Sequence, residues 1–355
     1  MSIGRWPMEL PPSDAASRGP AEASDAGPDG RQTDAVCRLV IVTPVFEDWD
    51  SFTRLIREID QVLDQRRVRC RIVAVDDGST TMLQEEQIAG CALSNIEAVE
   101  ILRLVCNLGH QRAIAVGLVA AAKSGGCDAV VVMDCDGEDR PDDLPRLLQC
   151  FREAPDRIAV ARRVKRSEGL GFRAFYLIYK LMFRLLTGKA ISFGNYCLIP
   201  ASVLNRTTFM PETWNNLASA LTRSRLPLQQ IGTNRGQRYA GRSKMNTVSL
   251  IVHGLSALSV YSDVAFVRML LSALALAGLT VLGIGTAVGI KFFSDLAIPG
   301  WTTDVVGSLL IVLLQAVMLL FGVAFLLLNS RSSPSSIPAL IAEDYIWMRT
   351  VVFAK

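Results

Sequence analysis

The chain has 355 residues, of which 50% are hydrophobic and 20% are charged, and its formal net charge is only +3. This composition is too apolar for an ordinary soluble enzyme of this length, so part of the chain is expected to lie in lipid. Basic residues cluster without the aromatic side chains on which bases stack, and this argues against nucleic-acid binding.

Residues 1–35 are rich in proline, alanine, serine, glycine and aspartate, which predicts a disordered tail that cannot bury a core. No apolar run precedes residue 35, so no signal peptide is expected. All eight cysteines precede residue 198, and none has metal-ligand or redox-motif spacing. We expect them to be reduced, small core residues of a cytosolic domain. His110 and His253 are the only histidines, so zinc is not expected.

Strand-like apolar runs alternate with helix-like segments between residues 36 and 160. The strand-like runs are residues 39–43, 71–75, 97–104 and 129–133, and the helix-like segments are residues 51–63, 81–89 and 111–123. Strand, crossover helix and strand again predict a doubly wound α/β domain with a mainly parallel sheet. In such sheets, ligands bind beyond the carboxyl ends of the strands.

Polar clusters stand at three of these strand ends: TPVFED (43–48), VDDGST (75–80) and MDCDGED (133–139). Carboxylates at the end of a buried strand repel one another and lose hydration, so we expect them to hold a divalent cation bound to phosphate oxygens. Asp134 and Asp136 share one face of an extended segment and can point at one ion. Turn formation alone is the alternative, but three aligned clusters favour a ligand site.

A resemblance to the GT-A domain of glycosyltransferase family 2 rests on four segments in this order: VTPVFED, VDDGST, NLGHQRAIAVGL and VVMDCDGEDRPDDLPRLL. More specifically, the chain resembles the membrane-bound polyprenyl-phosphate glycosyltransferases similar to dolichyl-phosphate mannose synthase, over residues 39–246. Two apolar spans that follow agree with the bacterial members. The resemblance implies a Rossmann-like GT-A catalytic domain at residues 36–246, followed by two transmembrane helices.

The resemblance implies a donor site at the ends of the first two strands. In the family, the loop after the first strand and the Asp-Asp-Gly-Ser turn hold the nucleotide base and ribose. Carboxylates suit this task because they accept hydrogen bonds from a base N–H or a ribose hydroxyl. The residues carried over to this role are Pro44, Val45, Glu47, Asp76 and Asp77.

The resemblance also implies that Asp134 and Asp136 bind Mg²⁺ or Mn²⁺ on the nucleotide diphosphate. Relatives often continue with Leu-Gln-Asp-Pro-Pro, whereas this chain has Gly-Glu-Asp-Arg-Pro at residues 137–141. Glu138 falls where the glutamine ligand would be, so it is a third candidate ligand. Asp139 is expected to orient the donor or acceptor sugar rather than to act as a general base.

Two basic segments, ARRVKRSEG (161–169) and RGQRYAGRSKMN (235–246), are expected to meet phosphates, which arginine binds bidentately. Family members place basic residues after the strand-like run at residues 158–161 to meet the acceptor phosphate, and the second segment resembles the family's flexible loop on the donor diphosphate. A solvated charge run is the alternative for the first. The candidates are Arg162, Arg163 and Arg166 for the acceptor, and Arg238, Arg242, Ser243 and Lys244 for the donor. Asn195 and Tyr196 are candidate acceptor contacts, although the family's usual acidic residue is absent there.

An amphipathic helix is predicted at residues 171–190, with apolar and basic residues on different sides. Its apolar residues at helical spacing are Phe175, Ile178, Met182 and Leu185, and its bases are Arg173, Lys180, Arg184 and Lys189. This pattern suits a helix at a membrane surface, and a core helix is the alternative. Residues 247–263 predict a juxtamembrane amphipathic segment.

Two apolar stretches, residues 264–290 and 305–328, each exceed the roughly 20 residues that cross a bilayer core. The loop between them holds one lysine and two aspartates, whereas several bases follow the second stretch. The positive-inside rule then places the catalytic domain and both termini in the cytoplasm, on the inner membrane, with Arg268 snorkelling. We expect residues 331–355 to be a cytoplasmic tail with a short helix at residues 339–353.

The resulting hypothesis is an inverting, metal-dependent transfer of a sugar from a nucleotide diphosphate sugar to a polyprenyl phosphate at the cytoplasmic membrane face. An acceptor phosphate is already an anion at neutral pH, so a strong general base is less necessary than for a hydroxyl acceptor. One alternative is a membrane glycosyltransferase with a polysaccharide or lipid hydroxyl acceptor, which usually needs a Gln-x-x-Arg-Trp motif and more spans. A catalytically silent scaffold is the other. A homo-oligomer is compatible with the sequence.

Overall fold

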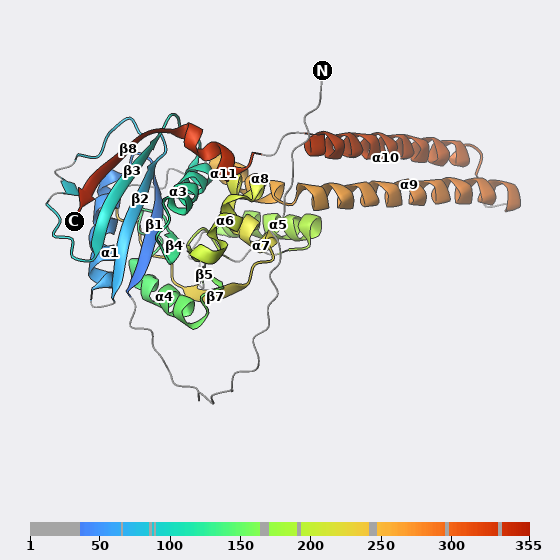
Figure 1. The fold of residues 1–355 in the computed structure, drawn as a ribbon. Helices are drawn as coiled ribbons and strands as arrows, with labels where there is room; N and C mark the ends of the chain where they lie inside the picture. Colours follow the sequence, from blue (N-terminus) through green and yellow to red (C-terminus); the bar gives the residue numbers. More distant parts are fainter. Residues whose placement is uncertain are drawn as a thin grey trace, which may run out of the picture. The chain divides into compact units, whose positions relative to one another are not determined.

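The computed structural model describes residues 36–64, 67–84, 87–88, 90–163, 170–189, 193–240, 247–294, 298–332 and 336–355 (Figure 1). The predicted disordered tail, residues 1–35, lies outside the described residues and stays a prediction.

An eight-stranded sheet forms the framework, with the strand order β7-β5-β6-β4-β1-β2-β3-β8. The strands are β1 (Cys37–Val45), β2 (Val68–Asp76), β3 (Ile96–Leu104), β4 (Ala129–Val132), β5 (Ile158–Arg163), β6 (Cys197–Pro200), β7 (Leu228–Thr233) and β8 (Ile346–Ala354). β4, β1, β2 and β3 run parallel, as do β5 and β7, while β6 and β8 run antiparallel to their neighbours. The predicted mainly parallel α/β domain is therefore confirmed.

Helices cover both faces of this sheet (Figure 1). They are α1 (Trp49–Leu63), α3 (His110–Ser124), α4 (Leu144–Glu153), α6 (Ala201–Thr208) and α7 (Leu217–Arg223). In β1, Leu39 and Ile41 pack in one core cluster with α1 and α4, whereas Val40 and Val42 pack in a second cluster with α3, α6 and α7. Because both faces are buried, the central strands need near-continuous apolar runs, which made them predictable from the sequence.

The predicted helices at residues 51–63 and 111–123 are confirmed as α1 and α3, but the helix predicted at residues 81–89 is wrong in its first half. Residues 81–84 are not helical, although residues 87 and 88 are. Trp49 Nε1 instead donates to the carbonyl oxygen of Thr81 at 3.0 Å, and the Thr81 hydroxyl donates to a nearby carboxylate. Such contacts from threonine hydroxyls and backbone compete with helix formation.

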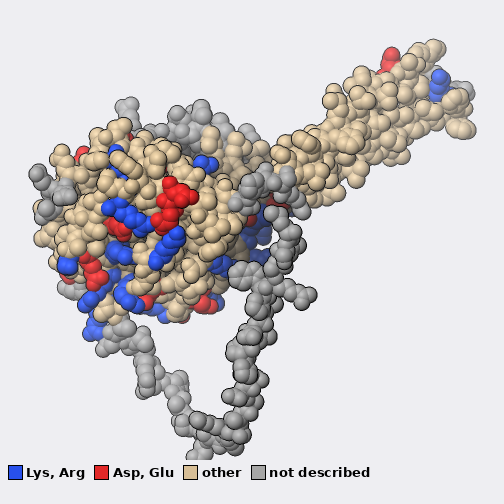
Figure 2. All heavy atoms as spheres, turned by 45° about the horizontal axis from the view of Figure 1, so that its top comes forward, with Lys and Arg blue, Asp and Glu red and all other residues tan. Residues whose placement is uncertain are grey.

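Two long apolar helices, α9 (Ser262–Phe293) and α10 (Trp301–Ser332), contain the two predicted spans and pack on each other. Each is long and apolar enough to cross a membrane, and no charged residue occurs in residues 269–290 or 305–330. Only 17% and 11% of their most apolar stretches are buried, whereas the core helix of a soluble protein is mostly buried. Figure 2 shows the hairpin surface almost free of charged side chains except near the connecting loop.

Side-chain contacts tie the start of α9 to the sheet domain through α5 (Leu170–Thr187) and α7. Arg268, which the sequence predicts to snorkel, directs Nη1 to the carbonyl oxygen of Leu185 at 2.7 Å and so caps the carboxyl end of α5. Arg223 on α7 binds both carboxylate oxygens of Asp263, at 2.8 and 3.0 Å. The entry into the first apolar helix is therefore held by fixed polar contacts.

The amphipathic helix predicted at residues 171–190 is present as α5, and one of its faces is open. Leu177, Leu181 and Leu185 are 67%, 59% and 66% exposed and lie one turn apart on one stripe. Lys180 and Arg184 are exposed beside that stripe. Phe183 instead packs against α8 (Thr247–Ser259) and Tyr261, on the side of the helix that faces the protein. Exposed leucines flanked by bases favour the membrane-surface interpretation over the core-helix alternative.

The C-terminal segment ends in a strand of the sheet, so the predicted tail is wrong, and the helix predicted at residues 339–353 is present only at its start. After the short turns α11 (Pro338–Ile341) and η3 (Ala342–Tyr345), β8 pairs antiparallel with β3. The physical reason is that β3 would otherwise leave an open edge of backbone donors and acceptors, and the β-branched and aromatic residues of β8 suit an extended chain. The last residue is also fixed, because the Lys355 N–H donates to the Glu97 carbonyl oxygen at 3.0 Å.

Gly117 on α3 provides a test of the packing under the sheet. A β-carbon at this position would lie 2.4 Å from Val42 Cγ1 and 2.8 Å from Val75 Cγ2, so a side chain fits only if these two buried valines of β1 and β2 move. We expect Gly117→Val to destabilise the domain by about 3 kcal/mol or more and to lower its apparent Tm. Ser124→Val, at the exposed end of the same helix, is the control and should leave the Tm nearly unchanged. Equal Tm values for the two variants would contradict this packing.

Candidate active site

The carboxyl ends of β1, β2 and β4 meet at one edge of the sheet and bring the three predicted polar clusters together. The Asp77 N–H donates to the Val45 carbonyl oxygen at 2.9 Å, and the Met133 N–H donates to the Val42 carbonyl oxygen at 3.1 Å. The backbone hydrogen bonds between neighbouring strands thus continue past the strand ends into the loops. The site is built on rigid elements, as ligand sites of parallel sheets are.

Glu47 fastens the loop after β1 to the loop after β2. Its backbone has a φ of +50°, an uncommon conformation for a residue with a side chain, and its N–H donates to Ser79 Oγ at 2.9 Å. The Thr80 backbone and hydroxyl and the Thr81 hydroxyl donate to its carboxylate. These hydrogen bonds, those of Thr80 first, lower the pKa of Glu47 to about 2. The side chain is therefore an anion at any physiological pH.

Asp76, at the end of β2, forms a buried ion pair with Arg103 near the end of β3. Arg103 Nε lies 3.5 Å from Asp76 Oδ2, and the two side chains are only 15% and 2% exposed. The Ser79 N–H donates to Asp76 Oδ1 at 2.9 Å, and Arg103 Nη2 donates to the Ser79 carbonyl oxygen at 2.9 Å. The two charges and the Ser79 turn thus form one hydrogen-bonded unit.

Asp77 holds the loop that leads into α3. Its carboxylate accepts hydrogen bonds from the Leu108 N–H at 2.7 Å and the Gly109 N–H at 3.0 Å. Burial raises the pKa of Asp77 to about 6, even though these N–H groups and His110 act in the opposite direction. Asp77 therefore supports the site by shaping the loop next to Asp76.

The loop after β4 folds around its own carboxylates. Asp139 is 4% exposed and its Oδ2 accepts from the Asp134 N–H at 3.1 Å, while Asp136 Oδ1 accepts from the Glu138 N–H at 2.9 Å. Gly137 has a φ of +87°, and a β-carbon there would lie 2.8 Å from the ring of Tyr239. Both the backbone conformation and the close approach of the ring require glycine at this position.

Positively charged groups surround the three candidate metal ligands. Arg238 Nη1 lies 3.3 Å from Asp136, Arg235 Nη2 lies 2.5 Å from Glu138, and His110 Nε2 lies 3.2 Å from Asp134. Burial and the neighbouring Asp134 raise the pKa of Asp136. Burial lowers the pKa of His110, but the carboxylates of Asp134, Asp139 and Asp136 outweigh it and leave that pKa raised. The acidic loop thus attracts cations.

The segment after β7 covers the acidic loop through its backbone. The Gly236 N–H donates to the Glu138 carbonyl oxygen, and the Tyr239 N–H donates to the Asp136 carbonyl oxygen, both at 2.9 Å. The Tyr239 hydroxyl donates to the Glu58 carboxylate on α1. Residues 235–239 are therefore fixed over the carboxylates by main-chain contacts, with Arg235 and Arg238 facing them.

The carboxylate oxygens of this loop suit a hard divalent cation whose remaining ligands come from a bound phosphate and water. In the part of the chain that the structure describes, no group of three His, Cys, Asp or Glu side chains is placed to hold a metal by itself. Mg²⁺ needs no such group, because it is commonly bound by one or two carboxylates with phosphate oxygens and water. Asp134 and Asp136 provide the two carboxylates, so the residues present fit the ion. Glu138 is paired with Arg235, and its role as a ligand stays a prediction.

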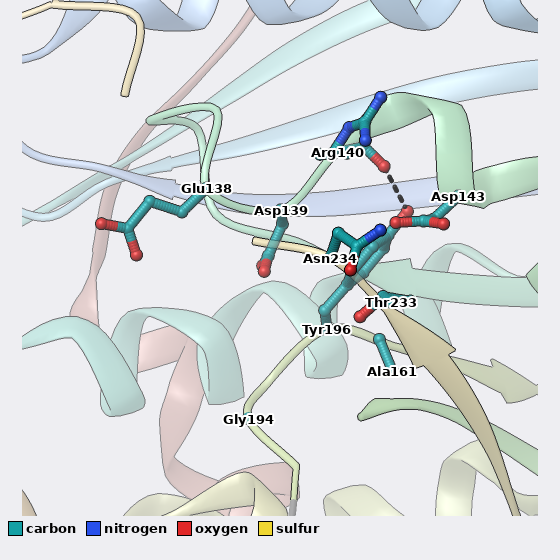
Figure 3. Close-up of a pocket in the computed structure, with 9 residues that line it drawn as sticks. All are labelled: Glu138, Asp139, Arg140, Asp143, Ala161, Gly194, Tyr196, Thr233 and Asn234. Atoms are coloured by element: carbon teal, nitrogen blue, oxygen red, sulfur yellow. Dashed lines mark hydrogen bonds between the residues drawn. The ribbon is translucent and has the colours of Figure 1, made fainter. Parts of the chain in front are cut away.

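A small pocket lies beside this loop, between Asp139 and residues of β5, β7 and the segment before β6. Its lining includes Gly194, Tyr196, Thr233 and Asn234. Figure 3 shows the Tyr196 hydroxyl on the Arg140 carbonyl oxygen, at 3.0 Å, while Glu138 extends away from the other labelled side chains. Burial raises the pKa of Tyr196 well above its usual range. Tyr196 is therefore a neutral donor that supports the acidic loop.

The remaining predicted residues divide into those near the loop, those at a strand end and those not described. Asn195 lies near the loop: Gln111 Nε2 donates to its Oδ1 at 3.2 Å, and its Nδ2 lies 3.1 Å from His110 Nε2. The side chains of Pro44 and Val45 are buried, so only their backbone can face a ligand. Arg162 and Arg163 pair with β7 at the end of β5, and Arg162 is exposed. Outside the described residues lie Arg166, Arg242, Ser243 and Lys244.

Sequence reasoning missed four residues that hold the site together: Arg103, His110, Arg235 and Tyr239. Arg103 had little signal, since the same strand also contains Glu97 and Glu100. His110 belongs to a segment quoted for the resemblance, but nothing in its spacing indicated Asp134 as a partner. Arg235 and Tyr239 depend on the packing of a loop more than ninety residues from the carboxylates that it contacts.

Comparison with protein families matches residues 40–210 to the family described as Glycosyl transferase family 2. The undecaprenyl-phosphate 4-deoxy-4-formamido-L-arabinose transferase of Erwinia tasmaniensis is 28% identical over 228 residues, which cover 61% of this chain and 66% of that protein. The protein of the same name from Salmonella choleraesuis is 27% identical over 225 residues, covering 60% and 64%. The chain thus spans slightly less than two thirds of the length of these relatives.

Among solved structures, the glucosyl-3-phosphoglycerate synthase from Mycobacterium tuberculosis, in complex with Mn²⁺, UDP-glucose and phosphoglyceric acid, aligns with a TM-score of 0.46. The two sequences are 13% identical, and the alignment covers 64% of this chain and 80% of that chain. The same protein with Mg²⁺ and UDP aligns with a TM-score of 0.45.

Asp77 gives a pH-dependent test of the electrostatics at this edge. A carboxyl whose pKa is about 6 in the folded protein binds its proton more tightly than in the unfolded chain, so it lowers stability as pH rises from about 4 to 6. At pH 7.5, Asp77→Asn should therefore increase the free energy of unfolding by up to roughly 3 kcal/mol and raise the apparent Tm. The difference from the wild type should vanish near pH 4. Thermal unfolding in detergent between pH 4 and 8 measures this.

Asp156→Asn, in the exposed turn between α4 and β5, is the matched control and should show no such pH-dependent difference. A lower Tm for Asp77→Asn at pH 7.5 would mean that the bonds from Leu108 and Gly109 need the charge and outweigh the cost of burial.

Proposed function

From the match of residues 40–210 to the family described as Glycosyl transferase family 2, we propose that the chain transfers a sugar from a nucleotide diphosphate sugar to a polyprenyl phosphate. The observation that carries this proposal is the acidic loop of Asp134 and Asp136, which faces Arg238 at the carboxyl edge of a parallel sheet. The relatives described above, named as undecaprenyl-phosphate sugar transferases, support the acceptor class.

The donor nucleotide is proposed to bind over the ends of β1 and β2. Glu47 is held as an anion and Asp76 is paired with Arg103, and carboxylates suit this role because they accept hydrogen bonds from a base N–H or a ribose hydroxyl. Because their partners already fix them, little ordering remains to be done when the nucleotide binds. This preorganisation favours binding and alignment.

The diphosphate is proposed to bind between Asp134, Asp136 and the arginines of residues 235–239. Mg²⁺ or Mn²⁺ held by the two aspartates would neutralise charge on the departing nucleotide diphosphate. Arg238 now pairs with Asp136, and it would turn to a phosphate oxygen when a divalent cation takes over the carboxylates. Arg242, Ser243 and Lys244 are proposed to extend this anion site.

The acceptor phosphate is proposed to approach from the pocket beside Asp139, with Arg162, Arg163 and Arg166 as its cations. A phosphate monoester is already an anion and can act as a nucleophile without a general base. The rate acceleration would then come mainly from alignment of the substrates and from stabilisation of charge on the leaving group. Asn195 is proposed to contact the acceptor, and Asp139 to orient a sugar. The exposed leucines of α5 support docking at the membrane surface where a prenyl chain would be anchored.

The membrane orientation is proposed to place the sheet domain and both termini in the cytoplasm, on the inner membrane. α9 begins after α8, and β8, which follows α10, returns to β3, so both ends of the hairpin belong to the same sheet domain. A pair of spans is consistent with this arrangement. The loop between α9 and α10 is then external.

Asp136→Asn tests the metal and diphosphate assignment. The purified protein in detergent, incubated with polyprenyl phosphate, Mg²⁺ or Mn²⁺ and a panel of nucleotide sugars, should form a single-sugar phospholipid that mild acid cleaves and mass spectrometry identifies. The variant should remain folded but lose about 100-fold or more in kcat, since it removes charge that acts on the leaving group. EDTA should abolish the wild-type activity.

Asp156→Asn is the matched control and should keep wild-type turnover. Full activity of the wild type in excess EDTA would contradict the metal assignment. A growing oligosaccharide, or an acid-stable glycoside on a hydroxyl, would contradict the phosphate acceptor and favour the alternative glycosyltransferase.

Ile298→Cys tests the orientation. Ile298, in the loop between α9 and α10, is 73% exposed, and a thiol there should react with a membrane-impermeant maleimide on intact spheroplasts. Cys106 is an exposed natural thiol on the sheet domain and serves as the internal reference, which should react only after permeabilisation. The reverse pattern would place the sheet domain outside.

A further inference from the structure

β8 departs from regular pairing with β3 at two places, Val352 and Trp347, and the second lies beside the donor side of the site. Arg103 pairs with Met348, and Leu104 pairs with Ile346, so Trp347 is an extra residue without a partner on β3. This is a β-bulge, which increases the local twist and redirects a side chain. Bulges are frequent next to active sites.

The side chain of Trp347 lies on the cation that holds Asp76. The guanidinium carbon of Arg103 is 5.4 Å from the centre of the Trp347 ring, within the range of a cation–π contact. Trp347 is 63% exposed, so this large apolar side chain is not kept in place by burial in the core. At this position, the Trp347 side chain contacts Arg103 instead.

Arg103 needs such a contact because its other interactions leave one side of the guanidinium unsatisfied. Nε faces Asp76 at 3.5 Å, and Nη2 donates to the Ser79 carbonyl oxygen, but Nη1 is buried without a hydrogen-bond partner in the described part of the chain. A buried donor without an acceptor is costly, and the negative face of an indole partly offsets that cost.

Contacts of this unit continue to the end of β1. Arg103 binds Ser79, whose hydroxyl accepts from the Glu47 N–H, and the Glu47 carboxylate binds Thr80 and Thr81. A change in the position of Arg103 would therefore reach both predicted nucleotide-binding carboxylates, Asp76 and Glu47. The acidic loop after β4 is not part of this set of contacts.

We propose that Trp347 is a positioning residue for the donor nucleotide: by covering Arg103, it fixes Asp76 and the Ser79 turn in the conformation that binds the base and ribose. This proposal rests on the proposed function. Its consequence is that the chain after the second apolar helix completes the donor site. Arg349 anchors that strand, pairing with Glu343 at 2.6 Å and lying 3.8 Å from Glu100 on β3.

The test compares Trp347→Ala, Trp347→Phe and Val351→Ala in the full-length protein. Val351 lies on the same strand, is 60% exposed and is the matched control for loss of side-chain surface on this edge. Calorimetric titration with nucleoside diphosphates and Mg²⁺ measures nucleotide binding without any turnover. Steady-state kinetics then separates KM for the nucleotide sugar from kcat.

Trp347→Ala should weaken nucleotide binding and raise KM for the nucleotide sugar about five- to thirtyfold, while kcat changes by less than about twofold. Trp347→Phe should lie between the wild type and the alanine variant, because phenylalanine binds cations more weakly than tryptophan. Val351→Ala should match the wild type in both measurements.

Unchanged nucleotide affinity in Trp347→Ala, or equal losses in Trp347→Ala and Val351→Ala, would overturn the inference. If Trp347→Ala does not fold, Trp347→Phe decides: wild-type affinity in that variant overturns the inference, and weakened affinity supports it. A wild type that binds a nucleoside diphosphate yet forms no glycolipid contradicts the proposed function alone, so the two failures are distinguishable.

Discussion

Like charges gathered at one edge of a sheet repel one another and lose hydration, and the rest of the site is arranged around that cost. Each carboxylate that faces this edge is matched with its own donor. Asp77 and Asp139 accept backbone N–H groups, Asp76 is paired with Arg103, and Asp136 is paired with Arg238. Elements far apart in the sequence therefore meet at this edge, because each supplies a hydrogen-bond donor to a carboxylate. A ligand that binds here has to replace some of these existing contacts.

The arginines of the site differ in how firmly their contacts hold them, and this difference suits them to different roles. Arg103 comes from the interior of a strand, is 15% exposed and binds a carboxylate, a carbonyl oxygen and an aromatic face. It is a permanent part of the framework. Arg235 and Arg238 come from a loop and are 40% and 24% exposed, so exchanging a carboxylate for a phosphate costs them less. A fixed cation suits recognition of the base and ribose, and exchangeable cations suit a diphosphate that arrives with its metal and leaves as product.

The parts of the fold that could be predicted from sequence were those whose signal is local. Buried parallel strands read as continuous apolar runs, and strand-end polarity placed Asp76, Asp134 and Asp136 at one edge. β8 could not be predicted, because what makes residues 346–354 a strand is the open edge of β3, almost 250 residues earlier in the chain. The Arg103 pair with Asp76 and the bulge at Trp347 depend on how β3 pairs with β2 and β8, and this register is set by strands that are far apart in the chain. The failed helix at residues 81–84 had the residues of a helix, but threonine hydroxyls bonded to Glu47 instead.

Under the proposed function, the protein joins a water-soluble donor to a lipid acceptor, and its catalytic edge then has to be held at a set distance from the bilayer. The contacts that do so here lie on both sides of the apolar hairpin. Before α9, Arg223 binds Asp263 and Arg268 caps α5, and after α10 the chain returns to the sheet as β8. The return strand carries Trp347 to Arg103, so the element that secures the hairpin also contacts the donor side of the site. If Trp347 positions the donor site as we propose, membrane attachment and donor recognition share one strand, and removing the C-terminal segment would disturb the nucleotide site as well.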